Sequence, residues 1–268
     1  MEIFVHGKTD KGLVRTNNED NFFLDNKTGL LVVADGMGGH ASGEIASKIA
    51  IDVIRDYFEV SKEKGAAPAG NYQEEYSETA IDVGSAVSFA NKAIYEAAKS
   101  NSAWQGMGTT VAAALLNGNR LSIAHVGDSR VYLVRAGNIE QLTDDHSVVY
   151  EQMKRELLTK EEAQKSEMKH VLTRALGTRS DVDVDVDELT LAGGDILILC
   201  TDGLNSMVSD DDILSVVAST NDPASACETL INMANTNGGK DNITVIAGYM
   251  RKKCRYSFLL NIKEWFRR

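Results

Sequence analysis

Several features that define other classes of protein are scarce or missing in this sequence of 268 residues. Two prolines and scattered glycines exclude collagen-like and proline-rich organisation, and no apolar run approaches the roughly 18 residues that a membrane span needs. Three cysteines, at 200, 227 and 254, have no CxxC spacing, which argues against a disulfide framework and a thiolate zinc site. The N-terminus lacks the basic stretch and apolar segment of a secretory signal. We therefore expect reduced thiols and a cytoplasmic location.

Charge is strongly acidic and unevenly distributed. The formal net charge is -11, yet residues 251–268 hold seven Lys/Arg and one acid, which leaves 21 basic and 38 acidic residues in 1–250. An acidic surface disfavours nucleic acid as a partner, because binding it requires clustered Lys and Arg. The tail, 251–268, is therefore a separate electrostatic segment.

The same tail has an amphipathic pattern. Phe258, Ile262 and Trp265 recur at helical spacing between basic residues. Such a pattern is typical of contact with an anionic membrane surface or a partner. We prefer the simpler interpretation, in which the tail is a helix packed on the domain or a frayed end.

Apolar periodicity predicts an α+β domain. Strands are expected at 2–7, 22–25, 30–35, 109–117, 121–128, 129–137, 181–187, 196–200 and 242–250. Helices are expected from Ser42 to about Phe58 and over 80–97, 210–219 and 223–235. Turns at Asn117-Gly118 and Gly137-Asn138 indicate hairpins and hence antiparallel pairing. We expect stacked sheets with helices outside.

One region adds little to the core. Residues 147–170 are polar and helical, with a capping box at Thr159 and Glu162 and few large apolar side chains. We expect an appended, mobile subdomain there.

Carboxylates recur at the ends of the predicted strands. They are Asp35, Asp128, Asp202 and Asp241. A single Asp-Gly, as at 35–36 or 202–203, is most simply a β-turn. Four like charges at neighbouring strand ends, however, are tolerable only with a cation among them. Oxygen ligands favour Mg²⁺, Mn²⁺ or Ca²⁺ over Zn²⁺, and the absence of EF-hand spacing argues against calcium.

A second polar cluster precedes the strand at 22–25. Arg15 suits bidentate binding of phosphate oxygens, and Glu19 and Asp20 suit the orientation of metal waters. The simpler interpretation is a charged loop. The glycine-rich turn at 36–40 lacks the Lys-Ser/Thr of a P-loop, so it is a weak signal.

Other chemistries receive little support. Cys200 lies within an apolar run and no GxSxG motif occurs, which disfavours covalent catalysis. The five histidines show no ligand spacing, so each is interpreted as a surface or packed side chain. The alternating aspartates of 181–187 are interpreted as the solvated face of a strand.

At this point the residues resemble a known family. The motifs that carry the resemblance are, in order, GLVRTNNEDNFFL, LLVVADGMGGHASGEIAS, GMGTTVAAALL, AHVGDSRVYLVRAGNIEQLTDDHS, DILILCTDGLNSMVSDDDI and KDNITVIAGYM. They resemble the metal-dependent serine/threonine protein phosphatases of type 2C, particularly short bacterial members. The resemblance runs from about residue 6 to 250. It implies an αββα sandwich of two antiparallel sheets, with the catalytic domain in 1–250, a flap at about 147–170, and the tail outside.

The resemblance also implies a metal centre of two Mn²⁺ or Mg²⁺ ions. Asp35 resembles the carboxylate that bridges the ions, and Gly36 the residue that gives a backbone carbonyl to one of them. Asp202 and Asp241 resemble the remaining ligands of the second ion. Asp128 is similar to the aspartate that helps Asp202 hold a third, weaker metal.

The other site residues follow in the same way. Arg15 resembles the clamp for the substrate phosphate, and Glu19 and Asp20 resemble the outer shell around the metal waters. Met37 stands where many eukaryotic members have a histidine proposed as the general acid, and a thioether cannot donate a proton. Either a metal-bound water or His40 would take that role, and we favour water.

The implied function is hydrolysis of phosphoserine and phosphothreonine in proteins, by a water activated between two metal ions. We expect a monomer that opposes a serine/threonine protein kinase, and substrate choice by the flap. Two alternatives stay open: a catalytically silent member that binds phosphoproteins, and a hydrolase of small phosphate esters.

Overall fold

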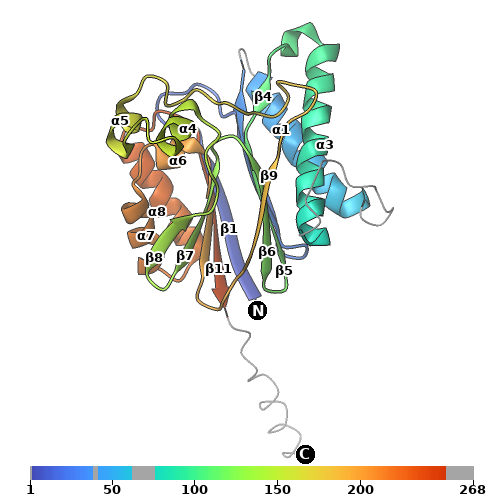
Figure 1. Ribbon diagram of the computed structural model, residues 1–268. Helices are drawn as coiled ribbons and strands as arrows, with labels where there is room; N and C mark the ends of the chain where they lie inside the picture. Colours follow the sequence, from blue (N-terminus) through green and yellow to red (C-terminus); the bar gives the residue numbers. More distant parts are fainter. Residues whose placement is uncertain (1, 39–41, 62–75, 252–268) are drawn as a thin grey trace, which may run out of the picture.

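The computed structural model describes residues 2–38, 42–61 and 76–251. Two antiparallel sheets pack face to face, and helices cover the outer face of each, so that four layers result (Figure 1). The first sheet has the order β1 (Glu2–Asp10), β11 (Ile243–Arg251), β10 (Ile196–Cys200), β7 (Arg130–Arg135) and β8 (Asn138–Gln141). The second has the order β2 (Asp20–Asp25), β3 (Leu30–Met37), β5 (Val111–Asn117), β6 (Arg120–Val126) and β9 (Asp185–Thr190). A short strand, β4 (Gly108–Thr109), pairs with the end of β3. The predicted αββα sandwich is confirmed.

The helices divide between the two outer faces. The second sheet is covered by α1 (Ser42–Asp56), which continues as the π-helix η1 (Tyr57–Ser61), and by α3 (Glu78–Ser100) (Figure 1). A short 3₁₀ turn, η2 (Ser102–Trp104), follows α3. The first sheet is covered by α6 (Asp202–Asn205), α7 (Asp210–Ser219) and α8 (Pro223–Thr236). Two short helices, α4 (Val148–Lys154) and α5 (Lys160–Lys165), lie at the end of the sandwich. Within the described ranges no helix is long and apolar enough to cross a membrane.

Central strands are apolar on both faces because both faces are buried. In β10, Ile198 and Cys200 pack against the helices of the first sheet, whereas Leu197 and Leu199 face the other sheet. The run ILILC therefore lacks alternation, as strands buried on both faces do. Its predicted central position, between β11 and β7, is confirmed.

Both predicted hairpins form, but they belong to different sheets. Gly118 and Gly137 have positive φ values of 67° and 81° in the β5–β6 and β7–β8 turns. Between the hairpins, the chain passes from one sheet to the other at Gly127. There φ is +105° and a Cβ would lie 2.6 Å from the Thr110 side chain, so glycine is required.

The strand predicted at 181–187 is displaced. Strand β9 begins only at Asp185, and Val182 and Val184 pack against the core from irregular chain. Asp181 and Asp187 are exposed, as expected, but Asp185 is not simply solvated. It accepts hydrogen bonds from His146 and Arg174, so the interpretation of a solvated face is wrong at that residue.

Candidate active site

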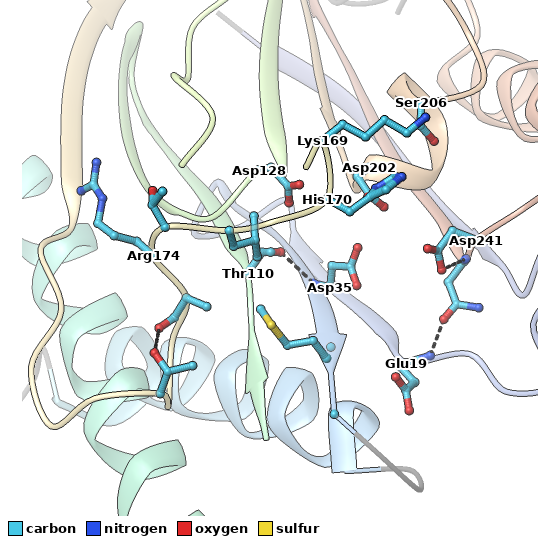
Figure 2. Close-up of a pocket in the computed structure, with 18 of the residues that line it drawn as sticks. Glu19, Asp35, Thr110, Asp128, Lys169, His170, Arg174, Asp202, Ser206 and Asp241 are labelled. Atoms are coloured by element: carbon cyan, nitrogen blue, oxygen red, sulfur yellow. Dashed lines mark hydrogen bonds and ion pairs between the residues drawn. The ribbon is translucent and has the colours of Figure 1, made fainter. Parts of the chain in front are cut away.

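The four predicted aspartates surround one cleft. Asp35 lies near the end of β3, Asp128 between β6 and β7, Asp202 at the start of α6, and Asp241 just before β11. All four line a cleft with a volume of about 870 Å³, and Figure 2 shows their carboxylates turned toward a common space. The fold therefore brings together carboxylates from four distant segments.

The two Asp-Gly pairs are not β-turns. Asp35 and Gly36 continue strand β3, and Asp202 and Gly203 begin α6. A Cβ at Gly36 would lie 2.1 Å from the carbonyl oxygen of Gly43, and one at Gly203 would lie 1.9 Å from that of Asn242. Each glycine is needed because another backbone segment passes against it. The turn interpretation was wrong because it considered each dipeptide alone.

Burial and mutual repulsion make the carboxylate cluster costly without a cation. The pKa of Asp35 is raised well above its usual range by burial and by the charges of Asp20, Asp202 and Asp128. Burial, followed by the charge of Asp202, raises the pKa of Asp128 to about 7. Such shifts arise when like charges share a poorly solvated site.

Unpartnered oxygens support the same conclusion. Oδ1 of Asp202 and Oδ1 of Asp20 are buried and have no hydrogen-bond partner among the described residues. Buried carboxylate oxygens without partners are expensive unless they bind an ion or water. The donor set is all oxygen, so these residues fit a hard divalent cation such as Mg²⁺ or Mn²⁺.

Arg15 lies at the mouth of the cleft. It is on the loop between β1 and β2, and Nη2 donates to Oδ2 of Asp241 over 2.7 Å. Its side chain is about half exposed, at 53%. The guanidinium therefore faces both a candidate metal ligand and solvent.

Glu19 and Asp20 occupy different positions. Glu19 lines the cleft, and its pKa is raised, first by burial. Asp20 is behind the cleft and pairs in register with Asp35. Its Oδ2 accepts hydrogen bonds from the hydroxyls of Thr201 and Thr244, at 2.8 and 2.7 Å. Burial raises the pKa of Asp20 to about 7, although these two hydrogen bonds act to lower it.

Two further residues of the cleft were not singled out by sequence reasoning. Thr110 accepts a hydrogen bond from the backbone N–H of Asp35 and shares one with Ser129, which fixes the end of β3. His170, from the end of the predicted flap, has Nδ1 3.7 Å from Oδ2 of Asp202, and that contact raises its pKa. No local pattern distinguishes His170 from the other histidines. Met37 lines the cleft, whereas His40 lies outside the described residues.

A buried histidine pair and the ion pair of Arg174 with Asp185 link the two ends of the 147–170 region to the sandwich. His125 and His146 stack with ring centroids 4.6 Å apart, and Nε2 of His146 lies 3.2 Å from Oδ2 of Asp185. Asp185 also pairs with Arg174. Both histidines are packed, as the sequence interpretation held.

His125, His146 and Asp185 have the composition of a metal site, with ligand atoms within 4.8 Å of one another. Their hydrogen bonds argue against that role. The N–H of Gly127 donates to Nδ1 of His146, so Nε2 must carry the proton that it donates to Asp185. Burial acts to raise the pKa of Asp185, but the hydrogen bonds from His146 and Arg174 hold it far below its usual range.

Comparison with known proteins places the chain in a family. The family model described as Protein phosphatase 2C matches residues 14–241. The chain belongs to the protein phosphatase 2C family. The serine/threonine phosphatase Stp of Listeria innocua is 37% identical over 242 residues, covering 89% of this chain and 92% of that one. The protein phosphatase PhpP of Streptococcus pneumoniae is 36% identical over 249 residues, covering 91% and 96%.

Solved structures of phosphatases share the fold. The Mycobacterium tuberculosis serine/threonine phosphatase PstP/Ppp superimposes with a TM-score of 0.83 at 33% identity, covering 94% of this chain and all of that one. The catalytic domain of PstP in complex with two manganese ions gives a TM-score of 0.80 at 34% identity, covering 93% and 99%. The family predicted from the sequence is therefore confirmed for this phosphatase 2C chain.

Proposed function

We propose that this protein is a metal-dependent protein serine/threonine phosphatase that hydrolyses phosphoserine and phosphothreonine. The observation that carries the proposal is the convergence of Asp35, Asp128, Asp202 and Asp241 on one cleft, with Arg15 at its mouth. Family membership and the names of the relatives support the same reaction.

The residues that would hold Mn²⁺ or Mg²⁺ are the oxygen donors that line the cleft. Asp35, the carbonyl of Gly36, Asp202 and Asp241 are assigned to two ions, and Asp128 with Asp202 to a weaker third. When bound, such ions lower the pKa of water toward neutrality and offset charge on the phosphoryl oxygens. The raised pKa values of Asp35 and Asp128 support their assignment as ligands, because a nearby cation would offset the burial and repulsion that raise them.

Residues around the ligands are assigned supporting tasks. Arg15 would bind the phosphoryl oxygens. Its guanidinium is exposed and its ion pair with Asp241 is therefore weak, so a phosphate can replace Asp241 as its partner at little cost in free energy. Glu19, at the cleft wall, and Asp20, with its unpartnered Oδ1, would accept hydrogen bonds from waters of the site. Met37 cannot donate a proton, so we assign protonation of the leaving alkoxide to water.

The wider setting is proposed as well. The catalytic domain would span 1–250 together with Arg251, which ends β11, with the flap at 147–170 beside the cleft and the rest of the basic tail, 252–268, outside it. We propose that the protein acts as a monomer in the cytoplasm and reverses the action of a serine/threonine protein kinase.

Phosphate release from a phosphothreonine peptide tests the proposal. The full chain would be assayed in parallel with Mn²⁺, Mg²⁺, Ca²⁺ and EDTA. We expect release with Mn²⁺ or Mg²⁺, none with EDTA, and none from Asp35→Asn with any metal. Metal-dependent activity that survives in Asp35→Asn would remove the proposed centre.

The same assay separates the alternatives. A silent phosphoprotein-binding member would bind the peptide without releasing phosphate. A hydrolase of small esters would act on metabolite phosphates far better than on the peptide. The exposed residues around the cleft favour the protein substrate, because an enclosed pocket is typical of metabolite sites.

A further inference from the structure

The cleft carries positive charge around its mouth in addition to the carboxylates at its base. Lys169 and Arg179 line it from the connection between α5 and β9, Lys240 lines it from the loop before β11, and all three are exposed. The volume of about 870 Å³ exceeds what a phosphoryl group fills, so there is room for neighbouring residues of a substrate.

These three cations differ from the other basic side chains of the cleft in their partners. Arg15 pairs with Asp241, His170 approaches Asp202, and Arg174 pairs with Asp185. In contrast, Lys169, Arg179 and Lys240 form no ion pair with any residue that the structure describes. Their charges are therefore available to a ligand.

Arg179 is presented from an anchored backbone. Oδ1 of Asn91, a buried residue of α3, accepts from the N–H of Gly177 at 2.8 Å. Nδ2 of the same side chain donates to the carbonyls of Arg179 and Ser180, each at 3.2 Å. One buried amide thus fixes the loop, and less entropy is lost when the exposed arginine binds.

The positive charge at the mouth of the cleft is opposite in sign to the net charge of the rest of the domain. Residues 1–250 carry 21 basic and 38 acidic residues, so the general surface repels anions. Exposed cations that line one cleft are the arrangement that attracts acidic groups to that cleft.

We propose that Lys169, Arg179 and Lys240 bind an acidic group beside the phosphoresidue, so that the preferred substrates are acidic phosphopeptides. The group is a carboxylate or a second phosphate, since both offer anionic oxygens. This inference rests on the proposed phosphatase function. Solvent-exposed ion pairs are weak, so each cation contributes about two- to fivefold in kcat/KM.

The first test compares peptides that share one phosphothreonine core. The flanking residues are alanine, aspartate, arginine or a non-hydrolysable phosphonate, which distinguishes carboxylate from phosphate. With Mn²⁺ at low salt, we expect the anionic peptides to have several-fold higher kcat/KM than the alanine peptide, and the advantage to shrink in 0.5 M NaCl, on the order of the ionic strength that screens exposed charges. Equal rates for alanine and aspartate peptides, or the highest rate for the arginine peptide, overturn the inference.

The second test changes Arg179, which is not adjacent to any assigned metal ligand. Arg179→Glu is expected to lower the ratio of kcat/KM for acidic over alanine peptides by at least twofold. The matched control is Lys27→Glu, at the opposite end of the β2–β3 hairpin, which makes the same change in net charge and should keep the ratio. An equal fall in both variants would show a general charge effect and overturn the local site.

A substrate without flanking residues distinguishes failure of the proposed function from failure of the inference about acidic substrates. p-Nitrophenyl phosphate with Mn²⁺ reports the hydrolytic reaction alone. If the wild-type protein hydrolyses neither it nor any peptide, the proposed function fails. If it hydrolyses all peptides at equal rates, only the inference about acidic substrates fails.

Discussion

Among the individual residues of the cleft, the aspartates carry the largest electrostatic cost. Burial raises the pKa of Asp128 in the cleft, and of Asp20 behind it, to about 7, compared with an ordinary value of 3.8. Because the folded state holds these protons more tightly than the unfolded chain, the cluster opposes folding once the pH removes them. A bound dication reverses that cost, which connects stability directly to metal binding.

The first prediction concerns stability against pH. Raised carboxyl pKa values give a contribution that is present below about pH 4 and lost as the pH rises toward about 7. In EDTA, the Tm of the wild-type protein should therefore fall relative to Asp35→Asn between pH 5 and 7.5. The comparison is needed because His125, whose pKa is lowered by burial, contributes the opposite slope. A Tm difference that stays constant over this range contradicts the prediction.

The second prediction concerns Arg15. Arg15→Ala should raise KM for a phosphothreonine peptide by about ten- to a hundredfold, since a charge-assisted hydrogen bond contributes about 1.5–3 kcal/mol. The Mn²⁺ concentration for half-maximal activity should change less, because the exposed pair with Asp241 is weak. Steady-state kinetics at several Mn²⁺ concentrations separate the two effects. A larger change in metal requirement than in KM would assign Arg15 to the metal centre instead.

The third prediction concerns Gly203. Gly203→Ala would place Cβ 1.9 Å from the carbonyl oxygen of Asn242, so backbone must move. We expect a loss of about 3 kcal/mol or more in the free energy of unfolding, measured in urea. The control is Gly137→Ala, which has φ of +81° but open space around it and should cost only about 1–2 kcal/mol. Because Gly203 has no positive φ, a cost no larger than that of the control would mean that the Asn242 carbonyl moves aside and that close approach does not require the glycine.

At the scale of elements, the region 147–170 is tied to the sandwich at its base. Arg130 of β7 donates two hydrogen bonds to Asp145, at 2.8 and 2.6 Å, and Gln141 donates another. Within the region, Thr159 and Glu162 form the predicted capping box of α5. Leu157 is 66% exposed, which is consistent with a segment that buries little apolar surface.

The fourth prediction tests the contacts of Asp145 that hold the region 147–170 on the sandwich. Arg130→Met should reduce the free energy of unfolding by about 3–5 kcal/mol, because it leaves the largely buried carboxylate of Asp145 without its main partner. The double variant with Asp145→Leu should recover part of the loss. Arg155→Met, an exposed change in the same region, should stay within about 0.5 kcal/mol in urea unfolding. A double variant no more stable than the single one would show that the pair is not the cause.

At the scale of the whole molecule, every described strand is in place by Arg251. The last strand, β11, lies between β1 and β10 and so joins the first and later parts of the chain. Arg251 also stacks over Phe4 and donates to the carbonyl of Asn221. Among the described residues, both sheets are complete at Arg251.

The fifth prediction follows. A chain that ends at Arg251 should fold. Mn²⁺ at 100 times its Kd should stabilise this chain and the full chain by about 2.7 kcal/mol each, so the Tm of both should rise equally. Phosphate release should be equal for the two chains. Loss of the Mn²⁺-dependent shift in the shorter chain would assign the tail a part in the domain. Co-sedimentation of both chains with anionic liposomes tests membrane contact separately, and equal binding would exclude it for the tail.

The sequence by itself determined most elements and the chemistry of the four aspartates, because apolar periodicity, caps and turn glycines act over a few residues. Thus ILILC, the helix from Ser42 and the capping box at Thr159 could be predicted from local pattern. The start of β9 could not, because Val182 and Val184 alternate whether or not a neighbouring strand pairs with them.

Only the tertiary structure decided which distant groups meet. Arg15 and Asp241, 226 residues apart, meet because β1 pairs with β11 in one sheet. Gly203 meets the backbone of Asn242 because β10 also pairs with β11, and Gly36 meets Gly43 because α1 starts against the end of β3. The histidine pair with Asp185, and the positive mouth formed by Lys169, Arg179 and Lys240, also have no signature in the chain order. The physical reason is that electrostatic and steric contacts depend on distance in space, which only the packing of the sheets and loops sets.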